Sequence, residues 1–81
     1  MIVTVHLFAA ARDMVGSSTI SIELPNGATI GQLRTILEGL YPSLVPLLAR
    51  SAVAVNHEYA DDGHPVTPSD ELAVIPPVSG G

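Results

Sequence analysis

Hydrophobic and polar residues alternate along three stretches of this chain, residues 2–8 (IVTVHLF), 18–24 (STISIEL) and 71–75 (ELAVI). A period of two is typical of a β-strand with one buried face, because successive side chains point to opposite sides of a sheet. A fourth apolar segment, residues 52–56 (AVAVN), predicts a short strand that is interrupted at Asn56. The pattern therefore predicts at least four strands.

The hydrophobic period changes to that of a helix between residues 29 and 42. Apolar residues recur there every three or four positions, which predicts an amphipathic helix with one buried stripe. Thr29 and Gln32 have the spacing of a capping box, in which each side chain bonds the backbone amide of the other residue. The predicted stripe consists of Ile30, Leu33, Leu37 and Leu40, with Ile36 beside it.

Two shorter segments also have helical character. Residues 9–15 (AAARDMV) contain good helix formers and are followed by Gly16, a residue that commonly ends helices. Residues 43–50 (SLVPLLAR) predict a further short helix with Ser43 as its cap. The turn signal of residues 61–63 (DDG) separates the fourth strand region from the last strand.

The order strand, strand, helix and then further strands predicts an α+β domain, with a mixed sheet packed on one main helix. Phe8 and Ile75 fall on the outer faces of the first and last strands, where polar residues are expected. The predicted core consists of Val3, Val5, Leu7, Ile20, Ile22, Leu33, Leu37, Val53, Val55, Leu72 and Val74.

The composition narrows the kinds of partner. The 81 residues correspond to one domain, with a net charge of −5 and arginine as the only basic residue type besides histidine. A chain without lysine and with this acidic balance lacks the basic surface that a nucleic acid requires. Charged residues make up 14% of the chain, against about 25% in ordinary soluble domains, so apolar surface is expected to be left for a protein partner.

No motif for autonomous chemistry is present in the sequence. Cysteine is absent, and His6, His57 and His64 lack the spacing of a metal site, so they are expected to lie at the surface or at strand edges. Arg12 is expected to be a solvent-facing helix residue, with a contact to an anion or a partner carboxylate as the alternative. With no apolar leader or membrane-spanning run in sight, we expect a soluble protein of the cytoplasm that binds no membrane, no metal and no resident cofactor.

The last six residues, PPVSGG, have unusual properties for the end of a domain. Pro76 and Pro77 end the last strand and favour an extended, stiff backbone, because prolines cannot donate to a ladder. Val78 offers one apolar contact and Ser79 is small, whereas Gly80 and Gly81 have no β-carbon and fit a narrow channel. These residues extend over at most about 20 Å. The tail therefore has the form of a tethered carboxylate that enters a pocket of another protein.

The segments AVIPPVSGG, VTVHLFAAARDMVG, AVAVN and PSDELAVI together resemble the small subunits of molybdopterin synthases. The resemblance covers the whole chain, and its most specific parts are the Pro-Pro-Val-Ser-Gly-Gly ending and the Phe8-Ala9…Arg12 cluster. The chain departs from the family in having Ser69 where glycine is common and in lacking lysine.

The resemblance implies a β-grasp (ubiquitin-like) domain over residues 1–75 and an extended tail over residues 76–81. It implies that an ATP-dependent activating enzyme adenylates the Gly81 carboxylate and that a sulfur donor converts it into a thiocarboxylate. The sulfur would then pass to a cyclic pyranopterin precursor in the active site of the large subunit, within a heterotetramer. This chain would be a subunit and sulfur-donating co-substrate, with Gly80 and Gly81 as its reacting end and covalent intermediates in place of a bound cofactor.

The resemblance also implies a partner-binding surface. It adds Tyr59 to Phe8 and Ile75 as an apolar patch on the outer sheet face, with Arg12 and the tail residues Pro76, Pro77, Val78 and Ser79 completing the contacts. Two alternatives share the Gly-Gly ending: a sulfur carrier of another pathway, such as thiamine or cysteine synthesis, and a ubiquitin-like modifier of target lysines. A third alternative is a non-covalent β-grasp binding domain whose Gly-Gly ending has no function.

Overall fold

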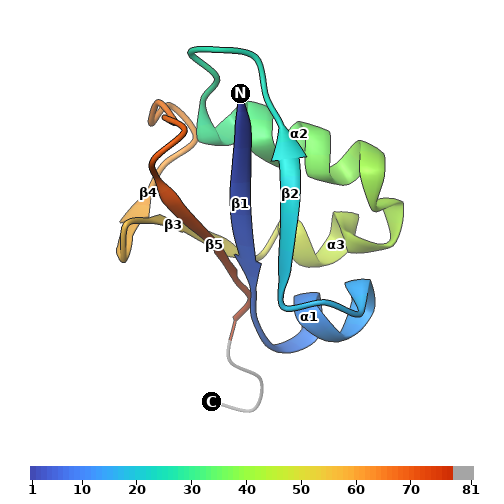
Figure 1. Cartoon of the computed structure of the whole chain (residues 1–81). Helices are drawn as coiled ribbons and strands as arrows, with labels where there is room; N and C mark the ends of the chain where they lie inside the picture. The colour runs from blue at the N-terminus through green and yellow to red at the C-terminus, as the bar shows by residue number, and fades with distance from the viewer. Residues whose placement is uncertain (78–81) are drawn as a thin grey trace.

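The computed structural model describes residues 1–77 of the chain. The described residues form one sheet of five strands, and the helices belong to the two connections that join the first three strands (Figure 1). In chain order the elements are β1 (Ile2–Leu7), α1 (Ala9–Val15), β2 (Thr19–Glu23), α2 (Ile30–Leu40), a 3₁₀ turn η1 (Pro42–Leu44), α3 (Val45–Leu48), β3 (Ala52–Val55), β4 (Glu58–Ala60) and β5 (Glu71–Ile75). The predicted α+β class with a mixed sheet is confirmed.

The sheet has the order β2-β1-β5-β3-β4, so the first and last strands lie side by side at its centre. β1 and β5 run parallel, with Val5 opposite Leu72 and Leu7 opposite Val74. All other pairs are antiparallel: β1 with β2, β5 with β3, and β3 with β4. The parallel pair brings the carboxyl ends of β1 and β5 to the same edge of the sheet.

The core lies between one face of the sheet and the helices α2 and α3, which Figure 1 shows on the same side of the sheet. Every residue of the predicted core is buried except Ile20, which is only partly buried because β2 is an edge strand. The predicted helical stripe is confirmed for Ile30, Leu33 and Leu37. The prediction for Leu40 is wrong: it is the last residue of α2 and is exposed, and Tyr41 packs against the core instead.

The predicted ends of the helices are confirmed in two of three cases. The Gln32 amide donates to Thr29 Oγ1 at 3.4 Å, and the Thr29 amide donates to Gln32 Oε1 at 2.9 Å, which completes the capping box of α2. Gly16 ends α1 with a φ of 86°, a left-handed conformation that glycine adopts without strain. Ser43 caps no helix, because it lies inside the 3₁₀ turn that Pro42 begins.

Arg34 connects α2 to two segments that are distant in the sequence. Its guanidinium donates to the carbonyl oxygens of Leu48 at 2.8 Å and Ser51 at 2.9 Å, where the chain leaves α3 for β3. Its Nε donates to Asp62 Oδ1 at 2.9 Å, in the loop after β4. The side chain is only 22% exposed, so these carbonyls have little access to water as an alternative donor.

None of the helices among residues 1–77 is long and apolar enough to cross a membrane.

Replacing Arg34 with alanine is expected to lower the free energy of unfolding by about 2–3 kcal/mol, because a charged donor is lost from two partly buried carbonyls. Urea unfolding followed by circular dichroism measures this change. Asp62→Ala is the matched control, since it removes only the exposed ion pair and should cost no more than about 1 kcal/mol. Equal losses in the two variants would show that the carbonyl contacts contribute nothing.

Candidate functional site

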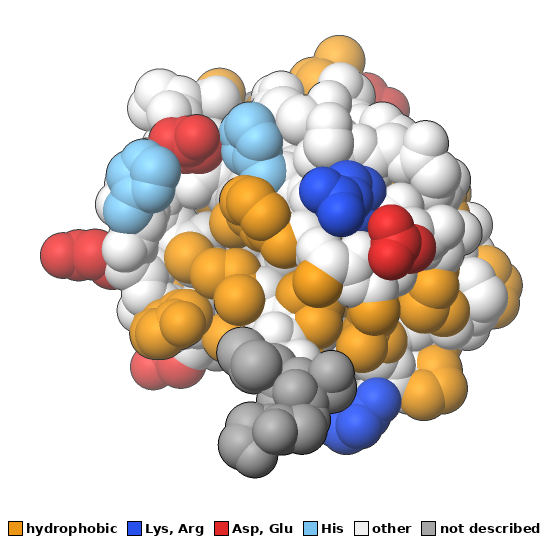
Figure 2. Space-filling view, turned by 90° about the horizontal axis from the view of Figure 1, so that it is seen from below, with side chains coloured by type: hydrophobic (Ala, Val, Ile, Leu, Met, Phe, Trp, Pro, Cys, Tyr) orange, Lys and Arg blue, Asp and Glu red, His pale blue; other side chains and the backbone are white. Residues whose placement is uncertain are grey.

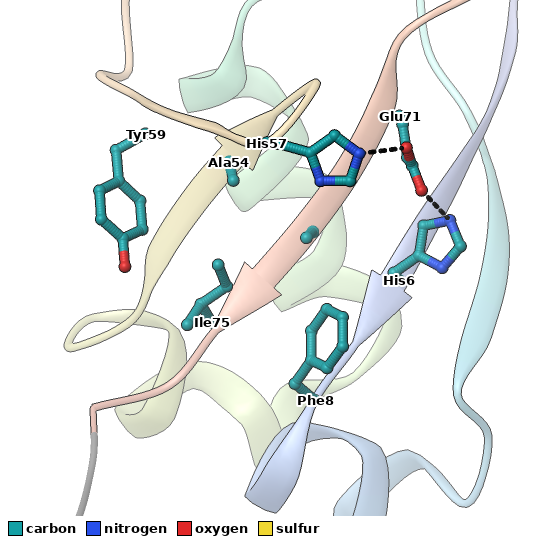
Figure 3. A pocket seen from close by; sticks show the side chains of 8 residues that line it. His6, Phe8, Ala54, His57, Tyr59, Glu71 and Ile75 are labelled. Carbon is teal, nitrogen blue, oxygen red and sulfur yellow. Dashed lines mark ion pairs between the residues drawn. The ribbon is translucent and has the colours of Figure 1, made fainter.

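The face of the sheet opposite α2 and α3 carries a pocket of about 370 Å³. We call it the outer-face pocket. It is lined by His6, Phe8, Ala54, His57, Tyr59, Glu71, Ala73 and Ile75 (Figure 3). Figure 2 shows hydrophobic side chains gathered on this side of the molecule, with an acidic side chain between two histidines at the border of the group. The pocket thus has a wide apolar part and a polar end.

The hollow arises from the size of the side chains on three neighbouring strands. Ala54 on β3 lies opposite Ala73 on β5 in the sheet register, and the two methyl groups form a low floor. Larger side chains surround it (Figure 3). Tyr59, on β4, lies opposite Ala54. Ile75 comes two positions after Ala73 on β5, and Phe8 directly follows β1. Small residues in the middle and aromatic residues at the sides give a concave apolar surface, which is the usual form of a recognition site.

Phe8 owes its position to an unusual backbone conformation. It precedes α1 as the helix cap in an extended conformation, and its carbonyl accepts the Ala11 amide at 3.1 Å. The next residue, Ala9, has a φ of 51°. A left-handed conformation of a residue other than glycine costs roughly 1–2 kcal/mol. The chain thus turns sharply from β1 into α1, and the ring of Phe8 stays on the outer face, 49% exposed.

The polar end of the pocket is formed by a carboxylate between two imidazoles. Glu71 Oε1 lies 3.5 Å from His6 Nε2, and Glu71 Oε2 lies 3.1 Å from His57 Nε2 (Figure 3). We call these three residues the histidine–glutamate cluster. Both histidines were expected at the surface or at strand edges, and no contact with Glu71 was predicted. The available signal was the alternation itself, which places His6 on the face of Phe8 and Glu71 on the face of Ile75.

A tight turn holds His57 against Glu71. Asn56 and His57 form the two-residue loop between β3 and β4, with φ angles of 52° and 71°. This loop favours Asn-Gly, because both central residues need positive φ. Asn56 fixes the turn to β5, since its amide donates to the Glu71 carbonyl at 2.8 Å and its Oδ1 accepts the Glu71 amide at 2.9 Å. His57 therefore occupies a position where a histidine is strained.

Asp70 supports the same turn from the start of β5. Its carboxylate accepts the Thr67 amide at 2.8 Å and the Asn56 side-chain amide at 3.0 Å. These hydrogen bonds, that of the Thr67 amide above all, lower the pKa of Asp70 below its usual value. The network fixes the backbone next to Glu71 and so orients the polar end of the pocket.

His57→Gly is expected to raise the free energy of unfolding by about 0.5–1 kcal/mol, because glycine relieves the left-handed strain and the imidazole loses only an exposed contact. Urea unfolding at neutral pH measures the difference in the free energy of unfolding. Asn56→Gly is the matched control at the neighbouring left-handed position, where two side-chain hydrogen bonds are lost and no gain is expected. A loss of stability in His57→Gly would contradict the assignment of strain.

The structure places the predicted site residues in three groups. Phe8, Tyr59 and Ile75 come together around the outer-face pocket. Arg12 lies outside the pocket, on an exposed face of α1, 3.8 Å from the Asp13 carboxylate.

The third group is the start of the tail. Pro76 is buried and Pro77 is exposed. The predicted Val78, Ser79, Gly80 and Gly81 contacts lie outside the described residues. Among residues 1–77, no group of three or more His, Asp or Glu side chains is arranged to hold a metal ion.

The fold and the site together define a class of protein. A mixed sheet with parallel central strands and a helix across one face is the β-grasp, ubiquitin-like fold, and the outer face is left open. The chain belongs to the ThiS family, whose sequence model matches residues 5–81.

Individual relatives are similar over nearly the whole chain. The molybdopterin synthase sulfur carrier subunit of Arabidopsis thaliana is 38% identical over 98% of this chain and 82% of its own length. The crystal structure of SAMP1 from Haloferax volcanii superimposes with a TM-score of 0.88 at 31% identity, covering both chains completely. A chain from the complex of subunits 1 and 2 of the molybdopterin-converting factor of Helicobacter pylori superimposes with a TM-score of 0.74 at 27% identity, also over both chains completely.

Proposed function

We propose that this chain is the sulfur carrier subunit of a molybdopterin synthase, with Gly81 as the end that is loaded. In this reaction the Gly81 carboxylate attacks ATP, which forms an acyl adenylate and releases pyrophosphate. A hydrosulfide equivalent from a sulfur donor then displaces AMP and leaves a thiocarboxylate. The large subunit binds this end and transfers its one sulfur to a cyclic pyranopterin precursor, and water returns the Gly81 end to a carboxylate. Two loaded chains in turn supply the two sulfur atoms of the dithiolene.

The observation that carries the proposal is the position of the outer-face pocket beside the end of β5. Ile75 is both the last residue of β5 and part of the pocket, and Pro77 follows two positions later. The remaining four residues can reach at most about 14 Å from Pro77. A partner bound on the outer face would therefore have its active site within reach of Gly81.

The pocket has few reactive side chains, which agrees with this role. The pocket contains apolar side chains and one carboxylate with two imidazoles, and lysine is absent from the sequence. Catalytic bases and anion-binding groups would come from the partners: the activating enzyme and the large subunit. The subunit 1–subunit 2 complex of Helicobacter pylori supports docking of this kind.

A ubiquitin-like modifier is the second candidate, and the likeness to SAMP1, the small archaeal modifier protein 1 of Haloferax volcanii, favours it. Both candidates need an activated C-terminal glycine and a docking face for the activating enzyme. They differ in the acceptor, which is a pterin for the carrier and a lysine of a target protein for the modifier.

Loading is tested by incubating the full chain with a molybdopterin synthase activating enzyme, ATP and a sulfur donor. The intact mass should increase by the difference between sulfur and oxygen, and the loaded chain with the large subunit should yield molybdopterin.

Deleting Gly81 moves the reactive carbon back by about 3.5 Å. Because a 1 Å error can cost about a hundredfold, this variant should give no product while it still binds the large subunit. Normal synthesis by the deletion variant would overturn the proposal, and appearance of lysine conjugates instead of molybdopterin would favour the modifier.

Phe8→Ala tests the docking face separately from the tail. Truncating a buried interface anchor costs about 2 kcal/mol or more, so the affinity for the large subunit should fall at least about tenfold. Met14→Ala is the matched control, because Met14 is 47% exposed, close to the 49% of Phe8, but lies on α1 outside the pocket. Isothermal titration calorimetry gives both affinities. Equal affinities for the two variants would show that Phe8 is merely exposed.

A further inference from the structure

We infer that the outer-face pocket fits an apolar partner surface without a basic side chain opposite Glu71, and that docking takes up one proton onto the histidine–glutamate cluster. The inference rests on the proposed function, because it concerns the surface that we propose to dock the large subunit. In this inference a protonated His6 or His57 neutralises the Glu71 carboxylate from within the chain, and we call this an internal counter-charge.

The carboxylate of Glu71 has an imidazole beside each of its two oxygens. Each oxygen of the Glu71 carboxylate faces a different imidazole, His6 Nε2 at 3.5 Å and His57 Nε2 at 3.1 Å. A protonated imidazole at either position forms an ion pair with the same carboxylate. A basic side chain arriving from a partner would meet an imidazole beside each of those oxygens. The cluster is built to satisfy its carboxylate from within the chain.

The net charge of the cluster depends on the protonation of its imidazoles. With both imidazoles neutral, the cluster carries one negative charge, and with one imidazole protonated it is neutral overall. The side chains of His6, Glu71 and His57 are 34%, 50% and 83% exposed, so water solvates the charge in the free chain. A partner that covers the pocket removes this water, and burying a charge without compensation is costly. Covering the cluster therefore favours its neutral form, which holds one more proton.

Histidine suits this role because it is the side chain whose charge ordinarily changes between pH 5 and 8. The affinity of a partner for this face should consequently rise as the pH falls from 8 toward 6. The protonated form is then supplied in advance, and docking no longer has to draw a proton from solution.

The other ionisable groups of the neighbouring elements do not supply the missing charge. Glu58 on β4 lies opposite the buried Val55 and so belongs to the other face, whereas the Tyr59 phenol lies on the pocket side. The Asp70 carboxylate is held by the Thr67 amide and Asn56. Glu23 on β2 lies opposite Ile2, about 13 Å along the strand from His6.

The arginines of the chain are also placed elsewhere. Arg34 binds carbonyls and Asp62 on the helical side of the sheet. Arg12, Arg50 and His64 are not among the residues that line the pocket, the N-terminal ammonium of Met1 donates to the Leu24 carbonyl, and the sequence contains no lysine. The two imidazoles are thus the cationic groups that the described part of the chain can offer to Glu71.

The strain at His57 is an independent observation that points the same way. Glycine fits this left-handed position better, yet the position holds an imidazole whose Nε2 lies 3.1 Å from Glu71. Strained residues that persist in a fold mark sites of function. Here the strained side chain is the one that completes the second contact to the carboxylate.

The inference is tested by titrating the full chain with the molybdopterin synthase large subunit at pH 6, 7 and 8. At each pH, calorimetry in two buffers with different ionisation enthalpies gives the affinity and the number of protons taken up. Uptake of a full proton corresponds to an affinity that rises about tenfold for each pH unit of decrease. The double variant His6→Gln, His57→Gln should bind without proton uptake by this cluster, and its affinity should depend much less on pH. Protons taken up by the large subunit itself are the same in all titrations and cancel in the comparison.

Glu71→Gln distinguishes the internal counter-charge from a basic side chain of the partner. Its cluster is uncharged at pH 8, so it should bind more tightly than the natural chain at that pH and lose affinity as the pH falls. Weaker binding of this variant at pH 8 would show that a partner cation contacts Glu71 and would overturn the inference. A complex with the same affinity at every pH would also overturn it, with the proposed docking intact. The absence of any complex between pH 6 and 8 would instead refute the docking that the proposed function requires.

Discussion

The parallel pairing of β1 with β5 is the constraint on which the rest of this molecule depends. It joins the first and last strands at the centre of the sheet, with Thr4 opposite Glu71 and Leu7 opposite Val74. Because parallel strands end at the same edge, Phe8 and Ile75 come to lie near each other although 66 positions separate them. The same pairing brings His6 next to β5 and carries the end of the described chain to the rim of the pocket.

The two faces of the sheet have separate tasks as a result. The inner face is filled by aliphatic side chains that pack against α2 and α3. Arg34, on α2, donates hydrogen bonds to the segments before β3 and after β4. Within residues 1–77 no helix covers the outer face, which combines small residues, aromatic residues and one carboxylate between two imidazoles. A stable inner layer allows the outer face to remain apolar and open, as a docking surface requires.

Backbone strain is concentrated around the pocket. The residues other than glycine with positive φ in the described chain are Ala9, Asn56 and His57, and each lies beside or within the outer-face pocket. Ala9 turns the chain so that Phe8 faces outward, whereas the Asn56–His57 turn directs an imidazole to Glu71. The fold thus accepts strain at both sides of the pocket, and the hydrogen bonds of Asn56 to Glu71 and Asp70 offset part of this cost.

Features that depend on near neighbours in the chain could be predicted from the sequence alone. The period of two assigned inner and outer faces to the strands, and the spacing of Thr29 and Gln32 located the start of α2. The terminal PPVSGG segment and the resemblance pointed to the family.

Features that depend on which strands become neighbours could not be predicted, because they exist only in the folded chain. A hydrophobic period states which way a side chain points but not what lies beside it. Ile20 was therefore predicted in the core and Leu40 in the helical stripe, although a sheet edge and a helix end leave them less covered. For the same reason the contact of Glu71 with His6 and His57 appears only once β1, β5 and the β3–β4 turn are assembled, because no local pattern links residues so far apart in the chain.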